Sequence, residues 1–363
     1  MNVDIIPNGR TADPQSEGPV ITGIDLCCGA GGLTHGLTRG GIRMVAGVDI
    51  DPQCNFPYSN NNSARFIKQS VTDLSGKQLA ELFGGARLRL MAGCAPCQLY
   101  STYNRNGQSL RQSKKWELVS DFARLARETT PDFVTMENVP QLKNQPVFLE
   151  FLSALEDYSV WWDIVECSRF GVPQTRKRLV LIASRLGKVK LVAPDQPEVN
   201  CPTVRDTISK LPQLKAGCSD TKDRLHTASC LSDLNLRRIK ASKPGGTWRD
   251  WDPALVASCH LKSSGKTYPS VYGRMEWDSP APTITTQCFG YGNGRFGHPE
   301  QDRAISLREA ALLQTFPENY QFVEPDGRVR FSQLGRLIGN AVPVRIGEVV
   351  AESLIDHARE YAE

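Results

Sequence analysis

The sequence predicts an α/β fold: a doubly wound, mainly parallel sheet domain joined to a second, smaller and irregular domain. Apolar runs of strand length alternate with helix-like segments through the first half of the 363 residues, which is typical of parallel sheets with crossover helices. After about Ser184 this alternation gives way to short segments rich in Pro, Gly, Ser and Lys. We therefore expect a sheet domain at 19–184, an irregular domain at 185–290 and a return to the first domain at 291–363.

The expected elements follow in order along the chain. Residues 20–28 form an apolar run suited to a buried parallel strand, a glycine-rich turn follows, and 33–39 has the pattern of a helix. The run 44–50 predicts a second strand, after which Pro52 can open a helix. Further strands are predicted at 66–67, 88–92, 133–136 and 179–183, and helical patterns lie at 117–128, 147–158 and 341–362. The polar, proline-containing residues 1–18 are expected to be flexible.

Composition is that of a soluble globular protein, with 40% apolar and 23% charged residues. No apolar stretch approaches the ~18–20 residues that a membrane span requires. The eleven cysteines have no regular spacing, which argues for a reducing compartment rather than a disulfide framework. We therefore expect a cytoplasmic protein.

The charge is distributed unevenly although the net charge is only +4. Three runs contain bases but no acid: four bases in 104–116, seven in 169–194 and five in 236–249. Trp248 and Tyr268 lie in or near these runs. Any single run could be ordinary solvated surface, but three of them with aromatic neighbours favour a nucleic-acid partner.

The glycine-rich turn after the first strand predicts a nucleotide-like ligand. Gly29 and its neighbours allow a backbone to approach a ligand closely. Asp49 stands twenty residues after Gly29, at the end of the second predicted strand, where an acid can bind ribose hydroxyls. Thr34 occupies the place of the third glycine of the dinucleotide fingerprint. A cofactor with an adenosine but no pyrophosphate fits better, and S-adenosylmethionine is the candidate.

A thiol and a carboxylate follow two other predicted strands. Cys97 comes after Ala95-Pro96, and Glu137 ends a later apolar run. Such a pair suits covalent attack on an unsaturated ring, in which the thiol adds and the acid stabilises the resulting charge. Taken alone, Cys94-x-x-Cys97 could also be a redox pair or half of a zinc site. No second cysteine or histidine pair lies nearby with zinc spacing, so we expect no metal.

These motifs, in this order, resemble the motif set of the DNA (cytosine-5)-methyltransferases. The resemblance is carried by the segments 24–33, 95–101, 137–139, 174–178 and 339–343, and by 274–286 and 305–317, which resemble bacterial members. It extends from about residue 21 to 350 and so covers nearly the whole chain. The resemblance implies a methyltransferase sheet domain with a target-recognition domain at 185–290.

The resemblance also implies a mechanism and a set of site residues. Cys97 would attack carbon 6 of cytosine as a thiolate, Glu137 would donate to ring nitrogen 3, and carbon 5 would take a methyl group from S-adenosylmethionine. Arg176 and Arg178 would help to hold the base and the active site. Because the ring is inaccessible in a stacked duplex, the cytosine must be flipped out. The expected cofactor-binding residues are Asp25, Leu26, Gly29, Gly31, Gly32, Asp49, Ile50, Asp73 and Asn340, and the expected DNA contacts are Ser101, Arg105, Arg237 and Arg249.

Two departures from the family pattern bear on these expectations. Ala95 stands where the family usually has proline, and Cys27 stands where a phenylalanine often packs on the cofactor adenine. Cys94 receives no role. Since Cys97 and Glu137 are both present, we expect an active enzyme rather than an inactive DNA-binding relative. A tRNA cytosine methyltransferase of the same fold is the nearest alternative, faintly suggested by Cys288-Phe289. The expected partner is double-stranded DNA, with a separate restriction endonuclease as a further candidate, and we expect a nucleoid-associated monomer.

Overall fold

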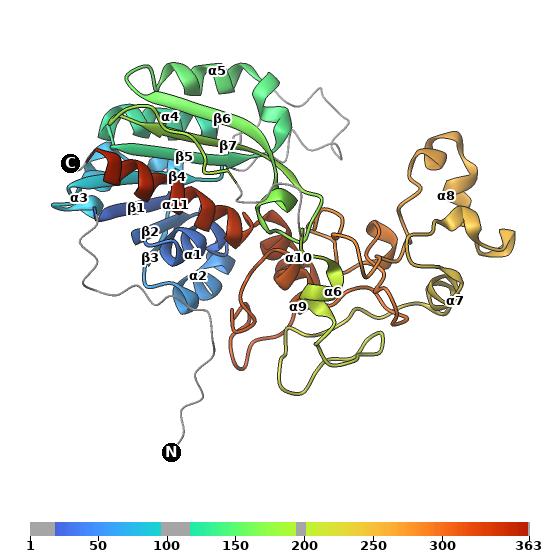
Figure 1. Ribbon diagram of the computed structural model, residues 1–363. Coiled ribbons are helices and arrows are strands. Elements are labelled where there is room, and N and C mark those ends of the chain that lie inside the picture. The colour runs from blue at the N-terminus through green and yellow to red at the C-terminus, as the bar shows by residue number, and fades with distance from the viewer. Residues whose placement is uncertain (1–18, 96–116, 194–200, 362–363) are drawn as a thin grey trace.

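The computed structural model describes residues 19–95, 117–193 and 201–361 (Figure 1). Within these residues, seven strands form one sheet in the order β3-β2-β1-β4-β5-β7-β6. Strands β1 to β5 run parallel to one another, whereas β7 is antiparallel to both β5 and β6. The strands are β1 (Ile21–Leu26), β2 (Arg43–Asp49), β3 (Arg65–Lys68), β4 (Leu88–Gly93), β5 (Phe133–Asn138), β6 (Ser159–Glu166) and β7 (Lys177–Ser184). The predicted mainly parallel α/β sheet is confirmed.

Helices cover both faces of the sheet, as a doubly wound fold requires. The helices are α1 (Gly32–Arg39), α2 (Asn55–Asn61), α3 (Gly76–Phe83), α4 (Glu117–Thr129), α5 (Pro146–Ser153), α6 (Val204–Ile208), α7 (Asp233–Ala241), α8 (Ser258–Leu261), α9 (Leu307–Leu313), α10 (Phe331–Asn340) and α11 (Val344–Glu360). Helices α3, α4 and α5 bury their apolar sides in one core, and α1 and α11 bury theirs in the core of the opposite face. Figure 1 shows α4 and α5 on one side of the sheet and α11 crossing the other.

Helix α11 lies against α1 at a contact that only small residues permit. A Cβ atom at Gly36 would meet the Val344 carbonyl oxygen at 2.1 Å and the Cα of Gly347 at 2.8 Å. The two helix backbones therefore approach directly, and the end of the chain is packed on its first βα unit. The predicted C-terminal helix is confirmed, and it begins at Val344 because Pro343 immediately precedes it.

Apart from the cores on the two faces of the sheet, a separate apolar core lies beyond the carboxyl edge of the sheet, and we call it the second core. It combines α6, α9 and α10 with residues from the segments 275–296 and 316–322. Within the segment 291–363, α11 thus packs on the sheet while α9 and α10 belong to the second core. The domain boundaries proposed from the sequence stay predictions. Helices α7 and α8 lie farthest from the sheet (Figure 1). Helix α7 contributes to a much smaller cluster around Ile239, and His260 of α8 stacks on Trp248, which belongs to another small cluster.

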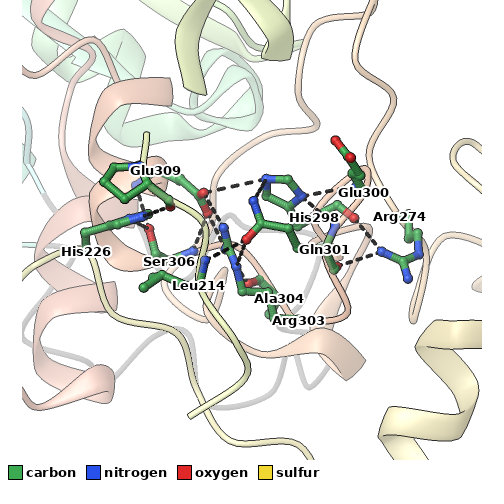
Figure 2. A network of polar contacts seen from close by, with 11 residues as sticks. Leu214, His226, Arg274, His298, Glu300, Gln301, Arg303, Ala304, Ser306 and Glu309 are labelled. Atoms are coloured by element: carbon green, nitrogen blue, oxygen red, sulfur yellow. Dashed lines mark hydrogen bonds and ion pairs between the residues drawn. The ribbon is translucent and has the colours of Figure 1, made fainter. Parts of the chain in front are cut away.

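A buried polar network holds the segment that leads into α9 (Figure 2). Arg303 is fully buried and makes two 2.7 Å hydrogen bonds to the carboxylate of Glu309. The same carboxylate accepts the backbone amide of Ser306 at 2.6 Å, which closes a capping box at the start of α9. Nearby, Arg274 donates to the carbonyl oxygen of His298 at 2.9 Å. Burial alone would raise the pKa of Glu309, but the Arg303 guanidinium outweighs burial and the pKa is lowered.

Candidate active site

The candidate active site is built along one edge of the sheet. Strands β2, β1, β4 and β5 are parallel neighbours, so their carboxyl ends lie side by side. These ends carry Asp49, the turn 29–32, the segment 94–95 and Glu137 in that spatial order. At about 4.8 Å per strand, β2 and β5 lie roughly 14 Å apart. The edge thus has room for a nucleoside at one end and a second planar group at the other.

The glycine turn has a backbone that most residues could not adopt. Gly29 and Gly31 have φ values of 55° and 89°, in the left-handed region that glycine occupies without strain. A Cβ atom at Gly31 would meet the Tyr320 hydroxyl at 2.9 Å, whereas one at Gly29 would meet nothing within 4 Å. The Tyr320 hydroxyl donates to the Ala30 carbonyl oxygen at 2.5 Å. The second core therefore helps to hold the turn, and the surface at Gly29 stays open.

Two carboxyl groups flank this turn. Asp49 accepts the backbone amides of Gly29 and Asp51, each at 2.9 Å, and burial raises its pKa. Asp25 is buried, accepts the Thr34 hydroxyl at 2.7 Å through Oδ2, and leaves Oδ1 without a hydrogen bond. Burial raises the pKa of Asp25 to about 7. The turn is therefore flanked by Asp49, whose carboxylate is oriented by two backbone amides, and by the buried Oδ1 of Asp25, which accepts no hydrogen bond from the described residues.

The other predicted cofactor residues differ in what they can present. Gly32 is buried as the first residue of α1, and the Leu26 side chain is buried in the sheet core. Ile50 follows Asp49 with 66% of its side chain exposed, which offers an apolar surface beside the acid. Asp73 and Asn340 are exposed, the first after β3 and the second at the end of α10.

Glu137 lies at the end of β5 and is only 5% exposed. Its Oε1 lies 2.9 Å from Nε of Arg178 on β7. Its Oε2 accepts a hydrogen bond from the Cys94 thiol at 3.1 Å. Next to it, the Asn138 side chain donates to the Ala95 carbonyl oxygen at 3.1 Å. The structure thus brings together the predicted acid, one of the two predicted arginines and Cys94, for which no role was predicted.

The two predicted arginines have different partners. Arg176 is buried and donates to the carbonyl oxygens of Ile284, Gly339 and Ala341 at 3.0 to 3.4 Å. Burial, and then the nearby charge of Arg178, lowers the pKa of Arg176 to about 10. Of the two arginines, Arg178 forms the ion pair with Glu137. Arg176 therefore links the start of β7 to the second core, whereas Arg178 lies against Glu137.

The remaining predicted residues fall into two groups. Cys97, Ser101 and Arg105 lie outside the described residues. Arg237 on α7 and Arg249 are exposed, far along the chain from the sheet edge, and Arg249 lies over the Trp248 ring at 5.5 Å.

Across 19–95, 117–193 and 201–361, no group of three or more His, Cys, Asp or Glu side chains is arranged to hold a metal ion. In the same residues, no helix is long and apolar enough to cross a membrane.

The fold of this chain is the α/β methyltransferase fold. A crystal structure of a protein described as a DNA modification methyltransferase encoded within an E. coli prophage matches with a TM-score of 0.70 and 21% identity. The match covers 93% of this chain and 99% of that one. Identity at this level establishes the fold alone.

Sequence comparison identifies the family. The model of the C-5 cytosine-specific DNA methylases matches residues 21–356. The type II methylase M.HgiDII of Herpetosiphon aurantiacus is 51% identical over 336 residues, which are 91% of this chain and 94% of that protein. The type II methyltransferase M1.HphI of Haemophilus parahaemolyticus is 30% identical, over 92% of this chain and 87% of its own length. The chain belongs to the C-5 cytosine-specific DNA methylases and is an enzyme, a DNA (cytosine-5)-methyltransferase, which confirms the resemblance seen in the sequence.

Proposed function

We propose that this enzyme methylates carbon 5 of a cytosine flipped out of a specific duplex DNA sequence, through a covalent adduct with Cys97. The thiolate of Cys97 attacks carbon 6 of the ring while Glu137 gives a proton to nitrogen 3. Carbon 5 thereby becomes electron-rich and takes the methyl group. Loss of the carbon 5 proton then expels Cys97 as a thiolate and restores the aromatic ring, and nitrogen 3 returns its proton to Glu137.

The observation that carries this proposal is the position of Glu137. The Glu137 carboxyl group is only 5% exposed and lies three strands along the edge from Asp49. Among the described residues, Arg178 forms an ion pair with its Oε1 and the Cys94 thiol donates a hydrogen bond to its Oε2. Buried acids at the carboxyl ends of parallel strands mark ligand sites in this architecture. A planar base that reached Glu137 would lie on the same edge as a nucleoside bound at Asp49.

The residues of the glycine turn fit S-adenosylmethionine as cofactor. When bound, this cofactor supplies the electrophilic methyl group. Asp49 is oriented to receive ribose hydroxyls, exposed Ile50 offers an apolar surface for adenine, and open space at Gly29 admits the ligand. The unused oxygen of Asp25 can accept a further donor. Leu26, Gly31, Gly32, Asp73 and Asn340 complete the proposed cofactor contacts.

Recognition of the DNA is assigned to the irregular domain and to the basic segment after Cys97. Arg237 and Arg249 would contact phosphates, and so would Ser101 and Arg105 outside the described residues. The enzyme would act as a monomer on DNA in the cytoplasm, at the nucleoid. Since both relatives above are named type II enzymes, a restriction endonuclease that acts separately is the proposed biological partner.

Transfer of radiolabelled methyl groups tests the proposed activity. The wild type should label duplex DNA and produce 5-methylcytosine in one sequence context, whereas Cys97→Ser should be inactive. Transfer to tRNA in place of DNA would favour the RNA alternative. Equal methyl transfer by Cys97→Ser and the wild type would exclude the covalent route.

A further inference from the structure

We infer that Cys94 is a positioning residue for Glu137, whose carboxylate it orients through a thiol hydrogen bond. This inference rests on the proposed function, in which Glu137 is the acid that acts on the cytosine ring. It assigns a role to a side chain that the family motif around Cys97 leaves unexplained.

The backbone at Cys94 is held from both sides, which fixes where the thiol can point. The amide of Cys94, one residue after β4, donates to the Leu26 carbonyl oxygen at 3.2 Å. The next carbonyl, that of Ala95, accepts the Asn138 side chain at 3.1 Å. Leu26 ends β1 and Asn138 ends β5, so the strands on both sides of β4 anchor this segment. The half-buried Cys94 thiol therefore starts from a fixed main chain.

The thiol and Arg178 contact different oxygens of the same carboxylate. Arg178 Nε lies 2.9 Å from Oε1 of Glu137, and Cys94 Sγ lies 3.1 Å from Oε2. The last torsion of a glutamate is broad, and an ion pair is weakly directional, so the contact with Arg178 alone leaves the carboxyl plane free to turn. The thiol hydrogen bond on the other oxygen fixes that plane. Since each carboxylate oxygen offers about two lone-pair directions, Oε2 can accept the thiol and still face a base.

A thiol suits this task because it is neutral and a weak donor. Cys94 gives direction without adding charge. Among the described residues, Arg178 supplies the positive charge that is paired with this acid.

Steady-state kinetics of Cys94→Ala and Cys94→Ser test this inference. Alanine removes the donor, and serine restores a neutral donor at the same position. We expect Cys94→Ala to lower kcat for methyl transfer to duplex DNA about tenfold, the effect of losing one hydrogen bond to a charged group. KM for S-adenosylmethionine and for DNA should stay within about twofold of the wild type, and Cys94→Ser should recover most of kcat.

The outcomes separate this inference from the proposed function. If kcat of Cys94→Ala equals that of the wild type, or if serine is as slow as alanine, Cys94 does not position the acid. A rise in KM for S-adenosylmethionine with kcat unchanged would also overturn the inference, since it would place the effect at the cofactor. If the wild type itself transfers no methyl group to DNA, it is the proposed function that fails.

Discussion

The carboxyl edge of the sheet and the region around α7 and α8 hold their functional side chains in opposite ways. At the sheet edge, Glu137 and Arg176 are buried, and their partners come from several strands and from the second core. Around α7 and α8, the candidate DNA contacts Arg237 and Arg249 are exposed on short elements supported by small apolar clusters. Leu261 on α8 is 71% exposed.

This difference matches the two tasks proposed for these regions, methyl transfer at the sheet edge and DNA recognition around α7 and α8. Bond making requires groups fixed to a fraction of an ångström, which rigid strands with locked side chains provide. Reading a duplex requires a surface that can follow a long, charged backbone, and short elements on loops provide that. The comparison predicts that changes at the sheet edge alter kcat, whereas changes around α7 alter DNA binding and its salt dependence.

The largest expected effect is at Glu137. Glu137→Gln keeps the shape of the side chain but removes the acid, so kcat should fall by at least about a hundredfold. Radiolabelled methyl transfer measures this, and the exposed Glu360→Gln on α11 is the control that should match the wild type. A kcat for Glu137→Gln close to that of the wild type would remove this residue from the chemistry.

The second expected effect is on folding, at the buried pair of Arg303 and Glu309. Arg303→Met leaves a buried carboxylate without its partner, which should lower the free energy of unfolding by roughly 3–5 kcal/mol. Urea denaturation measures the loss. The matched control is Arg359→Met, because Arg359 and its partner Asp356 are both 59% exposed. That control should change stability by less than about 1 kcal/mol, and equal losses in the two variants would contradict the account.

The third expected effect is a pH dependence at His298. Burial lowers its pKa to about 4, so the folded protein keeps this ring neutral while the unfolded chain takes up a proton below about 6.5. The stabilisation is therefore complete above pH 6.5 and is lost as the pH falls toward 4, by about 2 kcal/mol at pH 5. Urea unfolding at pH 7.5 and pH 5 should show a smaller acid loss for His298→Asn than for the wild type. Equal losses would mean that another group controls acid stability.

The smallest expected effect is at Arg237, and its neighbour in sequence provides the contrast. Arg237→Ala should raise KM for DNA a few-fold and reduce the salt slope of binding by about 1, with kcat unchanged. Arg238 is buried instead, donates to the Leu255 carbonyl oxygen at 2.8 Å and lies over the Tyr272 ring. Arg238→Ala should lower the unfolding temperature. If the two substitutions had identical effects on folding and on DNA binding, Arg237 would not be a DNA contact distinct from the structural Arg238.

Much of the sheet could be predicted from the sequence, because buried parallel strands are continuous apolar runs. Strand β6 was missed for the converse reason: it is an edge strand with exposed Trp162 and Asp163, so its pattern is broken. Helix α10 was also missed, since its burial depends on the second core rather than on the sheet.

The residues of the candidate site could be proposed from the sequence, but their contacts with one another could not. The family resemblance assigned Glu137 and both arginines to one site, but only the folded chain shows that Arg178 contacts the acid while Arg176 contacts backbone carbonyls. The role inferred for Cys94 depends on one side-chain direction at the end of β4, which no sequence pattern encodes. In the same way, nothing in the sequence distinguishes the neighbours Arg237 and Arg238, but in the structure the first is exposed and the second is buried.

We propose covalent catalysis by Cys97 with Glu137 as the acid, and adduct mapping tests this proposal most directly. The wild type is incubated with S-adenosylmethionine and duplex DNA that carries 5-fluorocytosine at the target, then digested and analysed by tandem mass spectrometry. The account predicts a stable adduct on Cys97, absent from Cys97→Ser and much slower to form in Glu137→Gln. Absence of an adduct in the wild type, or an adduct on Cys94 instead, would contradict it.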